Sequence, residues 1–257
     1  MVSLSSAITS EDPPLLLVRI SRALCCFCQI GPLAKTSPVL AIRQWNESSI
    51  AVSGCAYAQA CLQRKDWAYL SDYVRLQALS KEGGVYLDTD VELLKPLDGY
   101  IDGSFHIGYM HNCALGTAVI ISPANHPILA RLIAHYQNLP PNRGINNNAI
   151  LTEFFLKHVS GFRLTGRSWS NPNIKVHPKT WFEQPSLDQA GGFAIHLFNR
   201  AWDPKAIHPA QSAITQKKIL FFLKRRLRCI YEELRCVYLP FYLRDRFQLP
   251  LHPKLSD

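Results

Sequence analysis

The stretch WAYLSDYVRLQALSKEGGVYLDTDVELLKP, residues 67–96, decides the fold of this chain. Between Trp67 and Ala78, apolar residues recur at steps of three and four, which is the period of one helix face. We therefore predict a helix over residues 56–81. The pair Gly83-Gly84 should end it, because glycine readily takes the left-handed conformation of a helix cap. The β-branched and aromatic run 85–87 then predicts a short buried strand.

Two aspartates, Asp88 and Asp90, follow this strand. Side chains two residues apart in an extended segment point the same way, so both carboxylates should converge at the carboxyl end of a strand, where open α/β sheets bind ligands. Converging carboxylates favour a cation between them, and hard oxygen ligands suit Mg²⁺ or Mn²⁺ rather than zinc. Such an ion would hold a diphosphate leaving group. Asp72 and Arg75 share one face of the preceding helix, and Arg75 adds a forked donor.

Short strands alternate with helices in the rest of the central part of the chain. This alternation predicts an α/β fold, with a sheet flanked by helices. Strands are expected over residues 117–122, where Pro123 closes the run, and over 174–177 and 194–198, and helices over 126–137 and 146–157.

The composition is that of a globular protein with a basic balance. Of 257 residues, 47% are hydrophobic, and 28 Lys and Arg against 19 Asp and Glu give a net charge of +9. These values exclude a disordered chain, a collagen and a small disulfide scaffold, and they favour an anionic partner. Eight cysteines form no paired metal-binding array, so we expect buried thiols in a cytosolic protein. Neither a spanning helix nor a secretory signal is expected.

Residues 71–97, SDYVRLQALSKEGGVYLDTDVELLKPL, resemble the DXD region of glycosyltransferase family 32, and the resemblance extends over about residues 45–202. This family includes sugar transferases of bacterial capsular polysaccharide and lipopolysaccharide synthesis. The resemblance implies a GT-A fold, a Rossmann-like mixed α/β sheet, and sugar transfer from a nucleotide-sugar donor with retention of configuration. It also implies that Asp72 contacts donor sugar hydroxyls and Arg75 lies near the diphosphate. Asp88 would face the ribose and sugar, and Asp90 would hold Mn²⁺ or Mg²⁺.

A second segment, AIHLFNRAW at residues 194–202, resembles the late histidine-to-tryptophan segment of the family, which closes over metal and diphosphate. In it His196 would be a metal ligand or a phosphate donor, and Trp202 would cover the sugar donor. Leu197 and Ala201 depart from the His and Ser common in the family, and a purely structural His196 is the alternative. PKTWF, residues 178–182, resembles the segment before this closing strand. Residues 146–148, three asparagines, are candidates for a donor or acceptor loop or, alternatively, for a helix cap.

The chain divides into three parts by pattern. We predict an atypical N-terminal segment at 1–43, a GT-A-like glycosyltransferase core at 44–209 and a basic amphipathic tail at 210–257. Family members usually open with a strand and an aromatic pattern that residues 1–43 lack. We therefore expect a missing or diverged first strand. A shifted reading frame or mis-set start, or a diverged N-terminal half, would explain it.

The tail carries most of the excess charge. Between residues 215 and 246, nine basic residues face three acidic ones, which gives +6 of the net +9, with apolar residues interleaved. Basic helices with an apolar face lie in membrane interfaces, so we expect docking on an anionic membrane surface. The alternative is a helix packed on the core with a solvated basic face.

The resemblance, together with the two aspartates, implies a metal-dependent glycosyltransferase that uses Mn²⁺ or Mg²⁺ and a UDP- or GDP-sugar. The acceptor would be a saccharide or a lipid-linked molecule in cell-surface polysaccharide synthesis. The expected location is the cytoplasm, peripheral to the inner face of the cell membrane. Three alternatives stay open: an inactive transferase remnant, a haloacid-dehalogenase-like phosphatase with Asp88 as nucleophile, and a nucleic-acid binder. No recognition motif supports the last, so no nucleic acid is expected as a partner.

Overall fold

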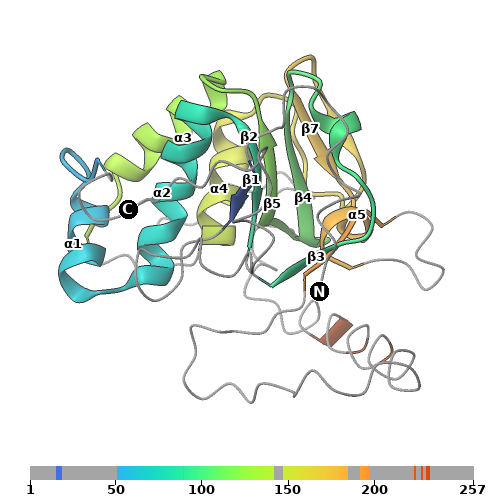
Figure 1. Cartoon of the computed structure of the whole chain (residues 1–257), viewed down its shortest axis with the longest axis horizontal. Helices are drawn as coiled ribbons and strands as arrows, with labels where there is room; N and C mark the ends of the chain where they lie inside the picture. Colours follow the sequence, from blue (N-terminus) through green and yellow to red (C-terminus); the bar gives the residue numbers. More distant parts are fainter. Residues whose placement is uncertain are drawn as a thin grey trace, which may run out of the picture.

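A computed structural model of the chain (Figure 1) describes residues 16–18, 51–88, 90–141, 147–184, 192–196, 223, 227 and 230–231. The strands form one mixed sheet of six and one small sheet of two. The large sheet has the order β1-β2-β5-β4-β7-β6, in which β1 pairs parallel with β2, β4 pairs parallel with β7, and the other pairs are antiparallel. Its strands are β1 (Leu16–Val18), β2 (Gly84–Leu87), β4 (Phe105–His111), β5 (Ala114–Ser122), β6 (Trp169–Ser170) and β7 (Ile174–His177).

Helices cover one face of the large sheet, and a small layer covers the other (Figure 1). The first layer consists of α1 (Ala56–Arg64), α2 (Trp67–Glu82), α3 (Pro127–Gln137) and α4 (Asn147–His158). The second layer consists of α5 (Lys179–Phe182) and the antiparallel pair β3 (Val91–Leu93) and β8 (Ala194–His196), next to a 3₁₀ turn at Asp98–Tyr100. This confirms the predicted α/β class with a mixed sheet flanked by helices, and it is consistent with the GT-A-like fold that the resemblance implies.

Both faces of the sheet are apolar. Successive side chains of a strand point to opposite faces, and apolar residues occupy both sets of positions. On β2, Tyr86 joins the large core under the four helices, whereas Val85 and Leu87 join a smaller core under α5, β3 and β8. On β5, Ile120 and Ile121 alternate in the same way. Both layers are therefore held on the sheet by burial of apolar area.

One prediction about the first elements needs correction, and for another the structure favours one of its two alternatives. The predicted single helix over 56–81 is two helices, because Lys65 takes a left-handed conformation (φ 60°) that ends α1, and α2 begins at Trp67. The N-terminal segment does contribute a strand, since Leu17 of β1 pairs with Tyr86 of β2. A strand from this segment is therefore present at the sheet edge, which favours a diverged over a missing one. The predicted boundaries at 43 and 209 lie outside the described residues.

The remaining predicted elements agree with the structure within a few residues. Gly83 ends α2 with φ 68°, and a Cβ there would approach the Ala124 nitrogen to 2.5 Å, so a glycine is required at position 83. β5, β7, α3 and α4 lie where strands and helices were predicted. β8 spans Ala194–His196 of the predicted 194–198, and residues 197–198 lie outside the described part. The strands β3, β4 and β6 and the short helix α5 were not predicted.

Two expectations from composition can be checked against the described residues. No helix in that part of the chain is both long and apolar enough to cross a bilayer. Cys55, Cys61 and Cys113 are buried thiols, as predicted, and burial raises the pKa of Cys61 to about 11. Cys25, Cys26, Cys28, Cys229 and Cys236 lie outside the described residues.

Candidate functional site

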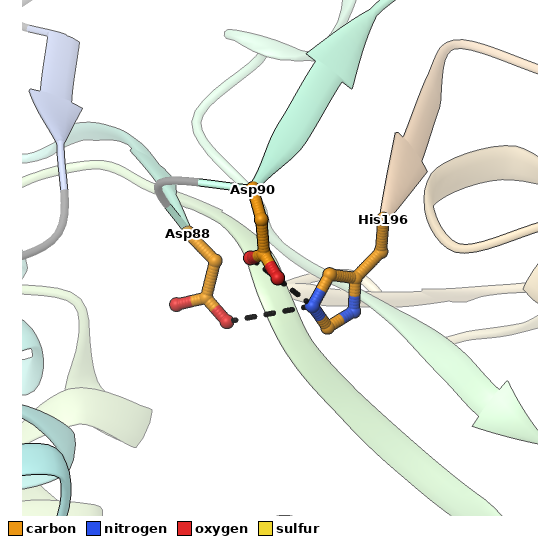
Figure 2. Close-up of side chains that lie close together, drawn as sticks. All are labelled: Asp88, Asp90 and His196. Atoms are coloured by element: carbon orange, nitrogen blue, oxygen red, sulfur yellow. Dashed lines mark ion pairs between the residues drawn. The ribbon is translucent and has the colours of Figure 1, made fainter. Parts of the chain in front are cut away.

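The candidate site lies where β2 ends. The Asp88 amide donates to the Ala118 carbonyl of β5, which extends the pairing of β2 by one residue before the chain turns. Asp90 then leads into β3, whose antiparallel partner is β8, with Val91 opposite His196. This register brings His196, about a hundred residues further along the chain, beside the two aspartates (Figure 2).

Asp88, Asp90 and His196 form a cluster with the donors of a divalent metal site. One ligand atom from each lies within 4.8 Å of the others. The His196 Nε2 is 3.3 Å from Asp90 Oδ1 and 4.0 Å from Asp88 Oδ2 (Figure 2), and the three side chains are between 10% and 14% exposed. Two carboxylates and one imidazole are ligands that a divalent transition metal accepts. The residues present therefore fit the Mn²⁺ or Mg²⁺ predicted from the sequence, with an imidazole nitrogen added to the oxygen set.

The other nitrogen of His196 contacts a residue that the sequence did not single out. His196 Nδ1 is 2.7 Å from Glu183 Oε2, and the Glu183 side chain is 2% exposed. Burial lowers the pKa of His196, but the charge of Glu183 and the hydrogen bonds with Asp90 and Glu183 outweigh it and raise this pKa to about 10. Without a metal the imidazole is therefore a cation held among carboxylates. The only sequence signal for Glu183 is an acidic residue directly after an aromatic pair, Trp181-Phe182.

Asp72 and Arg75 lie on α2 directly behind Asp88. The Arg75 guanidinium is 2.5 Å from Asp72 Oδ1 through Nη2, and 3.4 Å from Asp88 Oδ1 through Nη1, which also donates to the Thr117 carbonyl at 3.0 Å. Only 4% of the Arg75 side chain is exposed. The shared helix face predicted for Asp72 and Arg75 is confirmed, and in this arrangement Arg75 joins α2 to the carboxylate at the end of β2.

Tyr86 supports the same carboxylate from the strand. Its hydroxyl donates to Asp88 Oδ1 at 2.6 Å, and its ring lies 4.5 Å from the Arg75 guanidinium carbon. Burial lowers the pKa of Arg75, but the surrounding Tyr86, Asp72 and Asp88 outweigh it and raise that pKa. Asp88 is thus fixed by two donors on one oxygen, while its other oxygen faces His196.

The asparagines at the start of α4 lie at the edge of this region. Asn148 Oδ1 accepts from the Thr117 hydroxyl at 2.9 Å, and the Thr117 carbonyl in turn accepts from Arg75. Asn147 Oδ1 accepts from the buried Tyr136 hydroxyl. These contacts connect α4 to β5 and α3. Asn146, Leu197, Ala201 and Trp202 lie outside the described residues, so their predicted roles stay predictions.

Comparison with known proteins gives one family match. Residues 27–105 match the model of a family described as a glycosyltransferase sugar-binding region containing a DXD motif. The matched region includes Asp72, Arg75, Asp88 and Asp90 and ends before Glu183 and His196. This match supports a glycosyltransferase family, as the resemblance in the sequence predicts.

One solved structure and the curated proteins complete the comparison. The structure of a PaToxG glycosyltransferase is similar over 41% of this chain, with 21% sequence identity and a TM-score of 0.35. The similarity covers 40% of that chain, so this chain corresponds to less than half of its length. No curated protein matches the sequence significantly.

Proposed function

We propose that this protein is a family 32 glycosyltransferase that moves a sugar from a UDP- or GDP-sugar to a saccharide or lipid-linked acceptor. The observation that carries the proposal is the convergence of Asp88, Asp90 and His196 at the carboxyl end of β2. A divalent metal bound there supplies positive charge for the departing nucleoside diphosphate. Retention of configuration and a place in capsular polysaccharide or lipopolysaccharide synthesis follow from the resemblance and belong to the same proposal.

Each residue of the site has a proposed part in donor binding. Asp90 and His196 would hold the ion, which the mixed oxygen and nitrogen set suits better to Mn²⁺ than to Mg²⁺. Arg75 and Tyr86 orient Asp88, because both donate to its Oδ1. The resemblance assigns Asp88 to the ribose and sugar, Asp72 to the sugar hydroxyls, Arg75 to the diphosphate and Trp202 to the cover of the donor.

The phosphatase alternative requires Asp88 to attack a phosphorus atom. Asp88 Oδ1 accepts from Tyr86 at 2.6 Å and lies 3.4 Å from Arg75, and donors of this kind make a carboxylate oxygen a weaker nucleophile. Asp88 Oδ2 lies 4.0 Å from His196 Nε2, within the candidate metal-binding cluster. The contacts therefore favour a binding role for Asp88.

The test of the proposal is nucleotide release from UDP- and GDP-sugars by the full chain, with and without Mn²⁺. We expect release that requires the metal and that falls at least about a hundredfold in Asp90→Asn, a loss typical of removing a group that stabilises transition-state charge. Asp66→Asn is the matched control, because Asp66 is an exposed carboxylate paired with Arg64. Metal-independent release, or an Asp90→Asn variant as active as the control, would contradict the proposal, and no release under either condition would favour the inactive remnant.

We also propose that the tail docks on the anionic inner face of the cell membrane. Its described residues Leu223, Leu227, Ile230 and Tyr231 are helical, follow one helix face by spacing, and are 45% to 65% exposed. The sequence around them contributes Lys224, Arg225, Arg226 and Arg228. This combination of apolar face and basic charge fits an acidic lipid surface.

Liposome flotation tests the docking. The full chain should float with vesicles that contain anionic lipid, and to a lesser extent with neutral vesicles. Changing Lys224, Arg225, Arg226 and Arg228 together to Glu should abolish flotation with anionic vesicles. Equal flotation of both proteins would contradict docking and favour a helix that packs on the core.

A further inference from the structure

Glu183 contacts His196 from the side opposite the aspartates. The two residues are connected twice, because the His196 amide donates to the Glu183 carbonyl at 3.2 Å and His196 Nδ1 lies 2.7 Å from Glu183 Oε2. Nδ1 and Nε2 lie on opposite sides of the imidazole ring, and Nε2 faces Asp88 and Asp90 (Figure 2). Glu183 therefore lies behind the candidate ligand and outside the ligand set itself.

The fold keeps a place for this carboxylate. Glu183 directly follows α5, and its amide donates to the carbonyl of Lys179, the first residue of that helix. Gly116 of β5 lies against it, and a Cβ at position 116 would come within 2.3 Å of Glu183 Oε1. A side chain at that position would displace Glu183, so the bare glycine is what allows the acid to reach His196.

We propose, on the basis of the proposed metal-dependent transfer, that Glu183 is a positioning residue that selects the Nδ1–H tautomer of His196 and presents Nε2 to the metal. A neutral imidazole has one protonated nitrogen, and a metal can bind only the other. A carboxylate on Nδ1 keeps the proton there, fixes the ring orientation and makes Nε2 a stronger ligand. Neither the family match, which ends at residue 105, nor the DXD spacing includes Glu183.

The first test measures Mn²⁺ binding to the full chain by the electron paramagnetic resonance of the unbound ion. Glu183→Gln retains the size and an acceptor but removes the charge, and it should weaken Mn²⁺ binding about 10- to 100-fold, as for other residues behind metal ligands. Glu153→Gln is the matched control, because Glu153 is equally buried and pairs with Lys157 on α4. Thermal unfolding in EDTA checks that the variants are folded.

A double-mutant cycle separates action through His196 from a general effect of charge. In a His196→Asn background the ligand nitrogen is absent, so Glu183→Gln should no longer change Mn²⁺ affinity. The same loss in both backgrounds would overturn the inference. If the Glu183→Gln variant binds Mn²⁺ with wild-type affinity while the Asp90→Asn variant no longer binds it, only the proposed role of Glu183 would be overturned. A wild-type chain that binds no Mn²⁺ would overturn both this inference and the proposed function.

A second measurement needs no variant and covers the case in which Glu183→Gln does not fold. In the Mg²⁺-loaded wild-type chain, long-range ¹⁵N–¹H spectra of the histidine rings report which nitrogen of His196 is protonated. We expect the proton on Nδ1. A proton on Nε2 with a bare Nδ1 would overturn the inference, because the nitrogen that faces Asp88 and Asp90 could not then be a ligand.

Discussion

Replacement of Arg75 by Met should destabilise the protein strongly even when no donor or metal is present. The guanidinium is 4% exposed and lies between Asp72 and Asp88, whose side chains are each 12% exposed. Met retains much of the volume but leaves two nearly buried carboxylates without their cation. Breaking a buried pair in this way costs about 3–5 kcal/mol. That is a large part of the roughly 5–15 kcal/mol that stabilise an ordinary domain.

Urea unfolding at pH 7 in EDTA measures this loss, because EDTA removes any contribution of a bound metal. Arg64→Met is the matched control. Arg64 also pairs with an aspartate, at 2.7 Å, but the two side chains are 43% and 39% exposed, and an exposed pair is worth about 0–1 kcal/mol. Asp72→Asn combined with Arg75→Met should recover part of the loss, since one uncompensated charge is then removed. An Arg75→Met variant within about 1 kcal/mol of the wild type would refute the idea that Arg75 holds the carboxylates in place.

Three further predictions concern other parts of the fold. Gly83→Ala should cost more than about 2 kcal/mol in urea unfolding, because position 83 has φ 68° and its Cβ would meet the Ala124 backbone, whereas Gly99→Ala, with open space around it, should cost little. Gly116→Ala should weaken Mn²⁺ binding, measured as for Glu183→Gln, because the new methyl group displaces Glu183; unchanged affinity would count against this reason. Stability should fall as the pH falls from about 6.5 towards 3. Burial, and after it the charges of His106 and Lys175, lower the pKa of His177 to about 3. In this pH range the unfolded chain therefore takes up a proton that the folded chain does not. Urea unfolding between pH 7 and pH 5 should show a smaller loss in His177→Gln than in the wild type, by up to about 1.4 kcal/mol per pH unit, and equal losses would exclude His177 as the cause.

Local patterns predicted the part of the site that is contiguous in sequence. Asp88 and Asp90 follow a strand that its β-branched and aromatic residues indicate, and Asp72 and Arg75 share a face because three residues make almost one helical turn. The same reasoning gave β5, β7, α3 and α4, whose apolar patterns are regular. In each of these cases, residues close together in the sequence are enough to set the helix or strand conformation and the face on which a side chain lies.

Elements whose conformation depends on tertiary contacts were not predictable in this way. Nothing in a lysine indicates the left-handed φ of 60° at Lys65 that separates α1 from α2. In the strand β4, FHIGYMH, two histidines interrupt the apolar residues, yet His106 is 1% exposed because His177 and Asp102 contact its two ring nitrogens. Polar side chains that are paired inside a protein thus weaken the very pattern by which a buried strand is recognised.

The pairing of β3 with β8 explains why His196 came from a resemblance and Glu183 from the structure alone. Opposite residues of an antiparallel pair are set by register, and a slip of one residue would turn His196 to the other face of the small sheet, away from Asp90. The Phe193 amide donates a hydrogen bond to the Trp181 carbonyl and the His196 amide to the Glu183 carbonyl, and these bonds hold that register against α5. The residues that fix β8 therefore also place the carboxylate behind the imidazole. The same contacts thus form β8 and orient His196. Because they join residues far apart in the chain, no spacing within the sequence predicts them.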